Sequence, residues 1–233
     1  MIAPLPFDRF EVLTFDCYGT LIDWESGILA AIGAALANHH RKINAQEVLS
    51  IYSELEPAAQ AAPYRTYREI LQAVMQGMGG RLGVSFSAEE ELSLAASLPH
   101  WKPFPDTVPA LRKLKSKYKL GIISNIDDDL FAKTASVLEV KFDYLVTAQQ
   151  VRSYKPSPQN FETALSRIGL PCEKILHVAE SVYHDIIPAK RLGLASVWVN
   201  RRACKVGPGA TRSVQGSPDL IVPDLKTLAE MAI

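Results

Sequence analysis

Short apolar runs alternate with amphipathic segments along most of the chain, and this alternation restricts the folds that the chain can adopt. Runs with strand character are expected at residues 11–15, 119–123, 144–147, 175–179 and 196–199. Helices with apolar positions three and four apart are expected at residues 107–117, 128–138, 158–168 and 184–192. Strands that alternate with helices of this length favour an α/β fold, in which helices cover both faces of a parallel sheet.

One stretch, from about residue 24 to residue 100, breaks this alternation. Its pattern is helical throughout, with helices expected at residues 27–36, 45–56, 65–78 and 88–96. We therefore predict an all-helical cap of residues 23–100, inserted into a core domain made of residues 1–22 and 101–233. Residues 205–218, with scattered Gly and Pro, are expected to form a surface loop before a last helix at residues 225–231.

The charge and cysteine content argue against several classes of protein. Of the 233 residues, 25 are Lys or Arg and 25 are Asp or Glu, so no basic field favours a nucleic acid or a membrane surface. The three cysteines lack C-x-x-C spacing, which predicts neither a disulfide framework nor a zinc site. No signal-like N-terminus or apolar run of membrane-spanning length is present. We expect a soluble, cytoplasmic protein with no nucleic-acid or membrane partner.

Polar side chains stand where several of the expected strands end. Asp16 follows the first strand, Ser124 and Asn125 follow the second, and Lys155 lies in the loop after the third. Asp185 comes shortly after the fourth strand. Because ligands of open α/β sheets bind outside the carboxyl ends of the strands, we expect these side chains to meet at one edge of the sheet.

Two other polar features are interpreted as structural. The acidic run Asp127–Asp129 lies where a helix is expected to begin, and its negative charges interact favourably with the dipole of that helix. His177 lies inside an apolar strand and is expected to be a hydrogen-bonded core residue.

The ordered motifs around the strand ends resemble those of the haloacid dehalogenase superfamily. They are F-D-C-Y-G-T-L, which contains Asp16 and Thr20, then I-I-S-N, S-Y-K-P and H-V-A-E-S-V-Y-H-D. The resemblance implies a Rossmann-like core with an inserted helical cap. It also implies that Asp16 is a nucleophile that forms an ester with the substrate, which water then hydrolyses. Lys155 would keep Asp16 charged, Asp185 would hold Lys155 or the water, and Thr20 and Ser124 would complete the catalytic set.

The residue two positions after the nucleophile distinguishes the branches of this family. Phosphatases of the superfamily usually carry a second Asp there, which protonates the leaving oxygen, whereas this chain has Tyr18. In this respect the chain resembles the (S)-specific 2-haloacid dehalogenases. The resemblance implies hydrolysis of a small 2-substituted carboxylate without a cofactor, with Tyr18 and Asn125 in contact with the substrate. Dimers are usual in that group, so a homodimer is also expected.

The chain departs from the dehalogenase pattern at two places. The arginine that the dehalogenases carry early in the cap is absent, and Arg65 and Arg68 are the nearest candidates to replace it as substrate-binding residues. The fourth motif carries Glu180, which is a metal ligand in phosphatases of the superfamily. Asp16 and Glu180 could hold Mg²⁺ through oxygen ligands, so a Mg²⁺-dependent phosphatase acting on a small phosphate ester stays open as the alternative.

Overall fold

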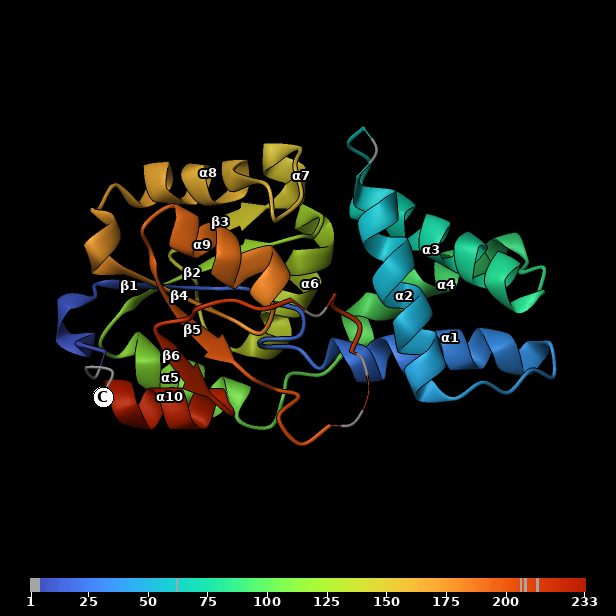
Figure 1. The fold of residues 1–233 in the computed structure, drawn as a ribbon, viewed down its shortest axis with the longest axis horizontal. Coiled ribbons are helices and arrows are strands. Elements are labelled where there is room, and N and C mark those ends of the chain that lie inside the picture. Colours follow the sequence, from blue (N-terminus) through green and yellow to red (C-terminus); the bar gives the residue numbers. More distant parts are fainter. Residues whose placement is uncertain (1–4, 62, 206, 208, 213) are drawn as a thin grey trace.

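A parallel sheet forms the centre of the larger part of the molecule. The computed structural model describes residues 5–61, 63–205, 207, 209–212 and 214–233. Within these residues the sheet has six strands in the order β3-β2-β1-β4-β5-β6, all paired in parallel (Figure 1). The strands are β1 (Val12–Phe15), β2 (Lys119–Ser124), β3 (Tyr144–Thr147), β4 (Ile175–Ala179), β5 (Ala195–Val199) and β6 (Leu220–Val222). This is the Rossmann-like α/β core that the sequence predicts.

Alternate residues of β1 face two different apolar cores, as the period of two in a strand requires. Leu13 and Phe15 belong to a large core that also takes in residues of α5 (Thr107–Lys115), α6 (Asp128–Leu138) and α10 (Leu225–Ala232). Val12 belongs to a smaller core with residues of α8 (Pro158–Ile168) and α9 (Ile187–Arg191). Helices therefore cover both faces of the sheet, with α8 and α9 above it and α5 and α10 below it in Figure 1.

Four helices between β1 and α5 form a unit beside the sheet (Figure 1). They are α1 (Trp24–Asn38), α2 (Ala45–Gln60), α3 (Tyr67–Leu82) and α4 (Ala88–Ser97). Capping boxes begin α3 at Thr66 and α4 at Ser87, because each hydroxyl and the glutamate three residues later bond each other's backbone N–H. A 3₁₀ turn, Leu98–His100, leads the chain back to the core. This arrangement is that of an inserted cap, and the boundaries at residues 23 and 100 stay a prediction.

The elements depart from the expected pattern in a few places. The expected helix at residues 184–192 is a π-helical turn, Val182–Ile186, followed by α9. The short helix α7 (Ala148–Val151) and strand β6 have no counterpart among the expected elements. Short 3₁₀ turns also occur at Phe7–Arg9 and Cys172–Lys174. The expected loop at residues 205–218 includes residues 206, 208 and 213, which lie outside the described part. No helix among the described residues is both long and apolar enough to cross a membrane.

Asp127 ties the helical unit to the sheet. Its carboxylate accepts hydrogen bonds from the backbone N–H groups of Tyr67 (2.9 Å) and Arg68 (3.1 Å), the first two residues of α3. The side chain is buried, and no side-chain cap hydrogen bond to its own helix α6 is present. The acidic run therefore does more than begin α6, because one of its members holds a cap helix to the core.

Asp127→Ala is expected to lower the free energy of unfolding by about 1–3 kcal/mol, because two partly buried N–H groups lose their acceptor. The matched control is Asp129→Ala, which removes only the exposed ion pair with Arg68 and should cost no more than about 1 kcal/mol. Urea unfolding of both variants measures the difference. Equal losses for the two variants would show that Asp127 does not tie the cap to the core.

Candidate active site

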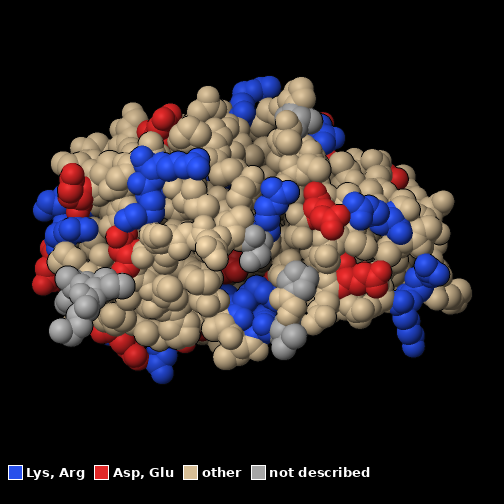
Figure 2. All heavy atoms as spheres, in the orientation of Figure 1, with Lys and Arg blue, Asp and Glu red and all other residues tan. Residues whose placement is uncertain are grey.

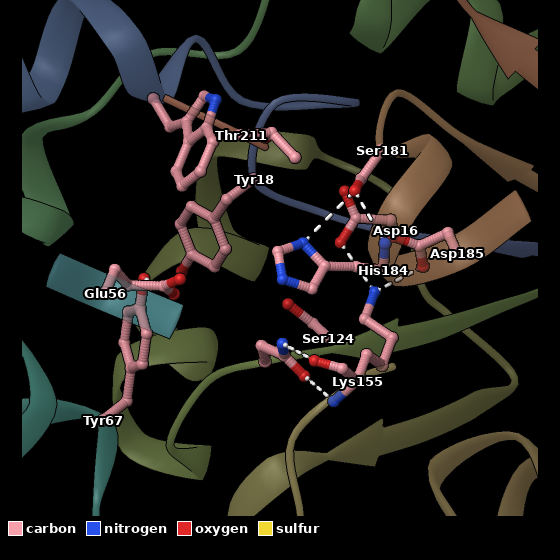
Figure 3. A pocket seen from close by; sticks show the side chains of 12 residues that line it. Asp16, Tyr18, Glu56, Tyr67, Ser124, Lys155, Ser181, His184, Asp185 and Thr211 are labelled. Atoms are coloured by element: carbon pink, nitrogen blue, oxygen red, sulfur yellow. Dashed lines mark hydrogen bonds and ion pairs between the residues drawn. The ribbon is translucent and has the colours of Figure 1, made fainter. Parts of the chain in front are cut away.

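The polar residues that follow the strands come together around one small cavity at the carboxyl edge of the sheet, as the sequence predicts (Figure 3). Asp16 follows β1, Ser124 ends β2, Lys155 follows α7, and Asp185 lies in the π-helical turn after β4. The volume of this cavity is about 30 Å³. The cavity lining combines core residues with three residues of the cap: Asp16, Tyr18, Trp24, Glu56, Tyr67, Ser124, Asn125, Lys155, Ser181, His184, Asp185 and Thr211.

The Lys155 ammonium is the centre of this site. Its Nζ donates to Asp16 Oδ1 (2.9 Å), Asp185 Oδ1 (2.6 Å) and the Ile123 carbonyl (2.8 Å), so all three N–H bonds have acceptors. The residue is only 2% exposed. Burial alone would lower the pKa of Lys155, but the two carboxylates outweigh it and raise that pKa, so the side chain stays charged.

Asn125 fixes the backbone that carries this lysine. Its Oδ1 accepts from the Lys155 N–H (2.7 Å), and its Nδ2 donates to the Lys155 carbonyl (3.1 Å). Asn125 lines the cavity as the sequence predicts, but its amide is engaged at both ends with Lys155. Its direct effect is to position the ammonium.

The Asp16 carboxylate is held at both oxygens. Lys155 binds Oδ1, and the Thr20 hydroxyl donates to Oδ2 at 2.7 Å. The same hydroxyl accepts from the Glu180 backbone N–H (2.9 Å), which directs its proton towards Asp16. Burial raises the pKa of Asp16, and Lys155 and Thr20 offset only part of this rise. A buried carboxylate with two fixed donors and little water around it is arranged for nucleophilic attack.

Asp185 is bound on one oxygen and free on the other. Oδ1 accepts from Lys155 and lies 3.1 Å from His177 Nε2, and His177 is held in turn through Thr14. Burial by itself would raise the pKa of Asp185, but Lys155 and His177 outweigh it and lower that pKa. Oδ2 is buried without a hydrogen-bond partner. This oxygen is an acceptor placed for a water or a ligand. His177 is a hydrogen-bonded core histidine, as predicted, and it also orients Asp185.

Two further polar atoms are buried without a partner in the wall of the cavity, Ser124 Oγ and His184 Nε2. Burial lowers the pKa of His184 to about 4, so its ring is neutral near pH 7. Its Nδ1 lies 3.2 Å from the Ser181 hydroxyl. Tyr18 lines the cavity too, with its hydroxyl 2.7 Å from Thr134 Oγ1. Unsatisfied polar atoms around a small cavity mark the position of a bound polar group.

The cap contributes a carboxyl group that the sequence analysis did not single out. Glu56 of α2 is 5% exposed and lines the cavity with Tyr67 and Trp24. Its sequence position carries a signal, because Val48 and Tyr52 lie on the same buried face at intervals of four residues. A carboxylate on an apolar helix face is unusual and could have been recognised as a candidate site residue.

The two arginines expected to bind substrate do not line this cavity in the described structure. Arg65 donates to the Ala59 carbonyl (3.1 Å), and Arg68 forms an ion pair with Asp129 at the surface. Arg65 Nε is buried without a hydrogen-bond partner. The substrate-binding role of the two arginines stays a prediction, and neither side chain reaches the cavity as described.

Glu180 and Asp16 do not form a pair of free oxygen ligands. Both Asp16 oxygens accept from Lys155 and Thr20, and the Glu180 side chain lines a neighbouring cavity with Trp198 and Arg202. Burial and the nearby Glu25 raise the pKa of Glu180 to about 8, which favours a protonated carboxyl group. Among the described residues no cluster of three or more His, Cys, Asp or Glu side chains could hold a metal ion. The site does not fit Mg²⁺ as the sequence alternative requires.

The fold and the site define a capped α/β protein with a lysine-bound carboxylate at the sheet edge. The family model described as haloacid dehalogenase-like hydrolase matches residues 10–193. The chain therefore belongs to the haloacid dehalogenase-like hydrolases.

Curated relatives include an (S)-2-haloacid dehalogenase of Pseudomonas putida, which is 28% identical and aligns over 96% of each chain. A glyceraldehyde 3-phosphate phosphatase of Methanothermobacter thermautotrophicus is 31% identical over 62% of this chain and 70% of its own. Among solved structures, a defluorinating L-2-haloacid dehalogenase has the same fold, with a TM-score of 0.81, 24% identity and coverage of 96% of this chain and 95% of its own.

Lys155→Met is expected to lower the free energy of unfolding by about 3–5 kcal/mol near neutral pH, because it leaves two buried carboxylates without their cation. Without the ammonium, the folded-state pKa values of both acids rise above their unfolded values, so the folded variant binds more protons and loses stability as the pH rises. The loss should therefore be larger at pH 8 than at pH 5. Denaturant unfolding at the two pH values measures this loss of stability. The control is Lys190→Met, which removes an exposed ion pair with Asp219 and should lower the free energy of unfolding by no more than about 1 kcal/mol. A loss independent of pH would contradict the charge network.

Proposed function

We propose that this hydrolase cleaves a small 2-substituted carboxylate, in the manner of a 2-haloacid dehalogenase, through an ester on Asp16. The observation that carries the proposal is the buried Asp16 carboxylate, fixed by Lys155 and Thr20 at the wall of a small cavity that has Tyr18 in place of a second acid. The 2-haloacid dehalogenase among the relatives aligns over nearly the whole chain and supports the same substrate class.

In the first step, an Asp16 oxygen attacks the carbon that bears the leaving group. The new C–O bond forms as the bond to the leaving group breaks, and the leaving group departs with the electron pair, which inverts the carbon. Lys155 keeps Asp16 ionised before the attack and stays bonded to its carbonyl oxygen in the ester. The partner-free Ser124 Oγ and His184 Nε2 are positioned to donate to the substrate carboxylate.

In the second step, water attacks the carboxyl carbon of the Asp16 ester. The partner-free Oδ2 of Asp185 accepts a proton from this water, which makes the water a better nucleophile. The charge that develops on the Asp16 oxygens faces Lys155 and Thr20, both of which donate hydrogen bonds. Collapse of the intermediate releases the hydroxy acid and restores Asp16. Substrate and water thus give the 2-hydroxy acid, the leaving anion and one proton.

The phosphatase alternative is disfavoured by the residue at position 18. Burial raises the pKa of Tyr18 well above its usual value, so its hydroxyl is a poor acid for an alkoxide leaving group. A phosphatase occurs among the relatives, but it aligns over a smaller share of this chain. The carboxylates around Asp16 also do not fit Mg²⁺.

The proposal includes a cytoplasmic location and association of two copies. Cys17, Cys172 and Cys204 are all unpaired, which suits a reducing compartment. Light scattering on the purified protein tests the dimer.

The wild-type protein is expected to release halide from (S)-2-chloropropionate, equally with EDTA or Mg²⁺. Asp16→Asn should abolish this activity, because the nucleophile is lost. Halide release and p-nitrophenyl phosphate hydrolysis are measured in parallel, and Asp8→Asn, at an exposed acid that does not line the cavity, serves as control. Phosphate release that needs Mg²⁺, without halide release, would reverse the assignment.

As the pH is lowered, kcat/KM is expected to fall, with a midpoint above the ordinary pKa of an aspartate. Burial raises the pKa of Asp16, so protonation removes the nucleophile in a range where Asp185, with its lowered pKa, is still ionised. Steady-state rates between about pH 4 and pH 8 measure this limb. An activity that stays flat down to the ordinary aspartate pKa would contradict a desolvated nucleophile.

A further inference from the structure

Glu56 lies on the opposite side of the cavity from the nucleophile. Figure 3 shows Glu56 and Tyr67, both from the cap, on one side, and Asp16, Lys155 and Asp185, from the core, on the other. In a displacement with inversion the leaving group departs on the side opposite the attacking oxygen. The departing group therefore moves towards the cap wall that carries Glu56.

The Glu56 carboxyl group is buried without a cation. Its described hydrogen bonds come from Gln60 Nε2 and the Tyr67 hydroxyl (3.4 Å), and none of the ion pairs in the described residues includes it. No arginine or second lysine lines the cavity within the described residues. An isolated buried carboxylate is costly, so the neutral acid is favoured. Burial indeed raises the pKa of Glu56 to about 7.

The hydrogen bonds also indicate which oxygen carries the proton. Gln60 and Tyr67 both donate to Oε1 of Glu56. The hydroxyl oxygens of Tyr52 and Tyr67 are 3.2 Å apart. When the acid is neutral, the oxygen that accepts both donors acts as the carbonyl oxygen. This arrangement assigns the proton of the neutral acid to Oε2, the atom that takes no part in these bonds.

We propose that Glu56, as a neutral acid, donates a hydrogen bond from Oε2 to the atom that leaves the substrate carbon. The inference rests on the proposed function and specifies its leaving group. A neutral carboxyl group helps most when the departing atom accepts strong hydrogen bonds, so the site suits fluoride or an oxygen better than bromide. An ionised glutamate would instead repel a departing anion.

The step balances without another reactant. The Asp16 oxygen forms the C–O bond, and the leaving atom departs with the electron pair of its bond to carbon. Fluoride takes only the hydrogen bond, whereas an oxygen takes the proton and leaves Glu56 ionised. Hydrolysis of the ester consumes one water, whose released proton can restore the acid.

The test compares leaving groups on one carbon skeleton: fluoroacetate, chloroacetate and bromoacetate. In Glu56→Gln and Glu56→Leu, kcat/KM for fluoroacetate should fall about 100-fold, within the range for loss of an acid, while that for bromoacetate falls about threefold or less. Glu54→Gln, on the exposed side of the same helix, is the control and should change none of the rates. An equal loss for the three substrates in both Glu56 variants would overturn the proposal.

An infrared difference spectrum between wild type and Glu56→Gln at pH 6 gives a readout that needs no turnover. The wild type should show the carbonyl band of a protonated carboxyl group, and added chloride should shift that band. A carboxylate band in its place, or a band that chloride does not move, would overturn the role of Glu56 even if Asp16 proves to be the nucleophile. Conversely, failure of Asp16→Asn to abolish activity would remove the proposed function and leave the infrared result unchanged.

Discussion

The arrangement of the site depends on one buried ammonium group. Lys155 joins Asp16, Asp185 and the end of β2, three points that lie far apart in the sequence, and it is bonded in all three directions. Two carboxylates this close would otherwise repel each other and take up protons. The lysine thus favours the ionised form of both acids, which the proposed roles of Asp16 and Asp185 require. Asn125 and Thr20 then fix the backbone and the carboxylate around it.

The positions of Asp16, Ser124, Lys155 and Asp185 could be predicted because they follow from topology. Each stands after a short apolar run, and parallel strands bring their carboxyl ends to one edge. The five expected strands lie within one residue of the observed ones at either end. The sixth, β6, was missed because three residues after an irregular loop carry no measurable period.

The cap side of the site could not be predicted in the same way. Which face of a cap helix meets the sheet depends on tertiary contacts such as those of Asp127 with the start of α3, and no local pattern encodes them. Charge and proximity in the sequence predict Arg65 and Arg68 as substrate-binding residues, yet neither lines the cavity among the described residues. Glu56, which does line the cavity, has a sequence signal in its spacing from Val48 and Tyr52, but that spacing does not tell which part of the molecule the buried face meets.

The proposed hydrolysis depends on a covalent ester at Asp16, and one isotope experiment tests for this ester directly. A single turnover of (S)-2-chloropropionate, with enzyme in excess, is run in water labelled with oxygen-18. If water attacks the Asp16 carboxyl carbon, the label enters the peptide that contains Asp16, and the hydroxyl oxygen of the product stays unlabelled. Label in the product hydroxyl, with none in that peptide, would mean that water attacks the substrate itself, and the nucleophilic role of Asp16 would be wrong.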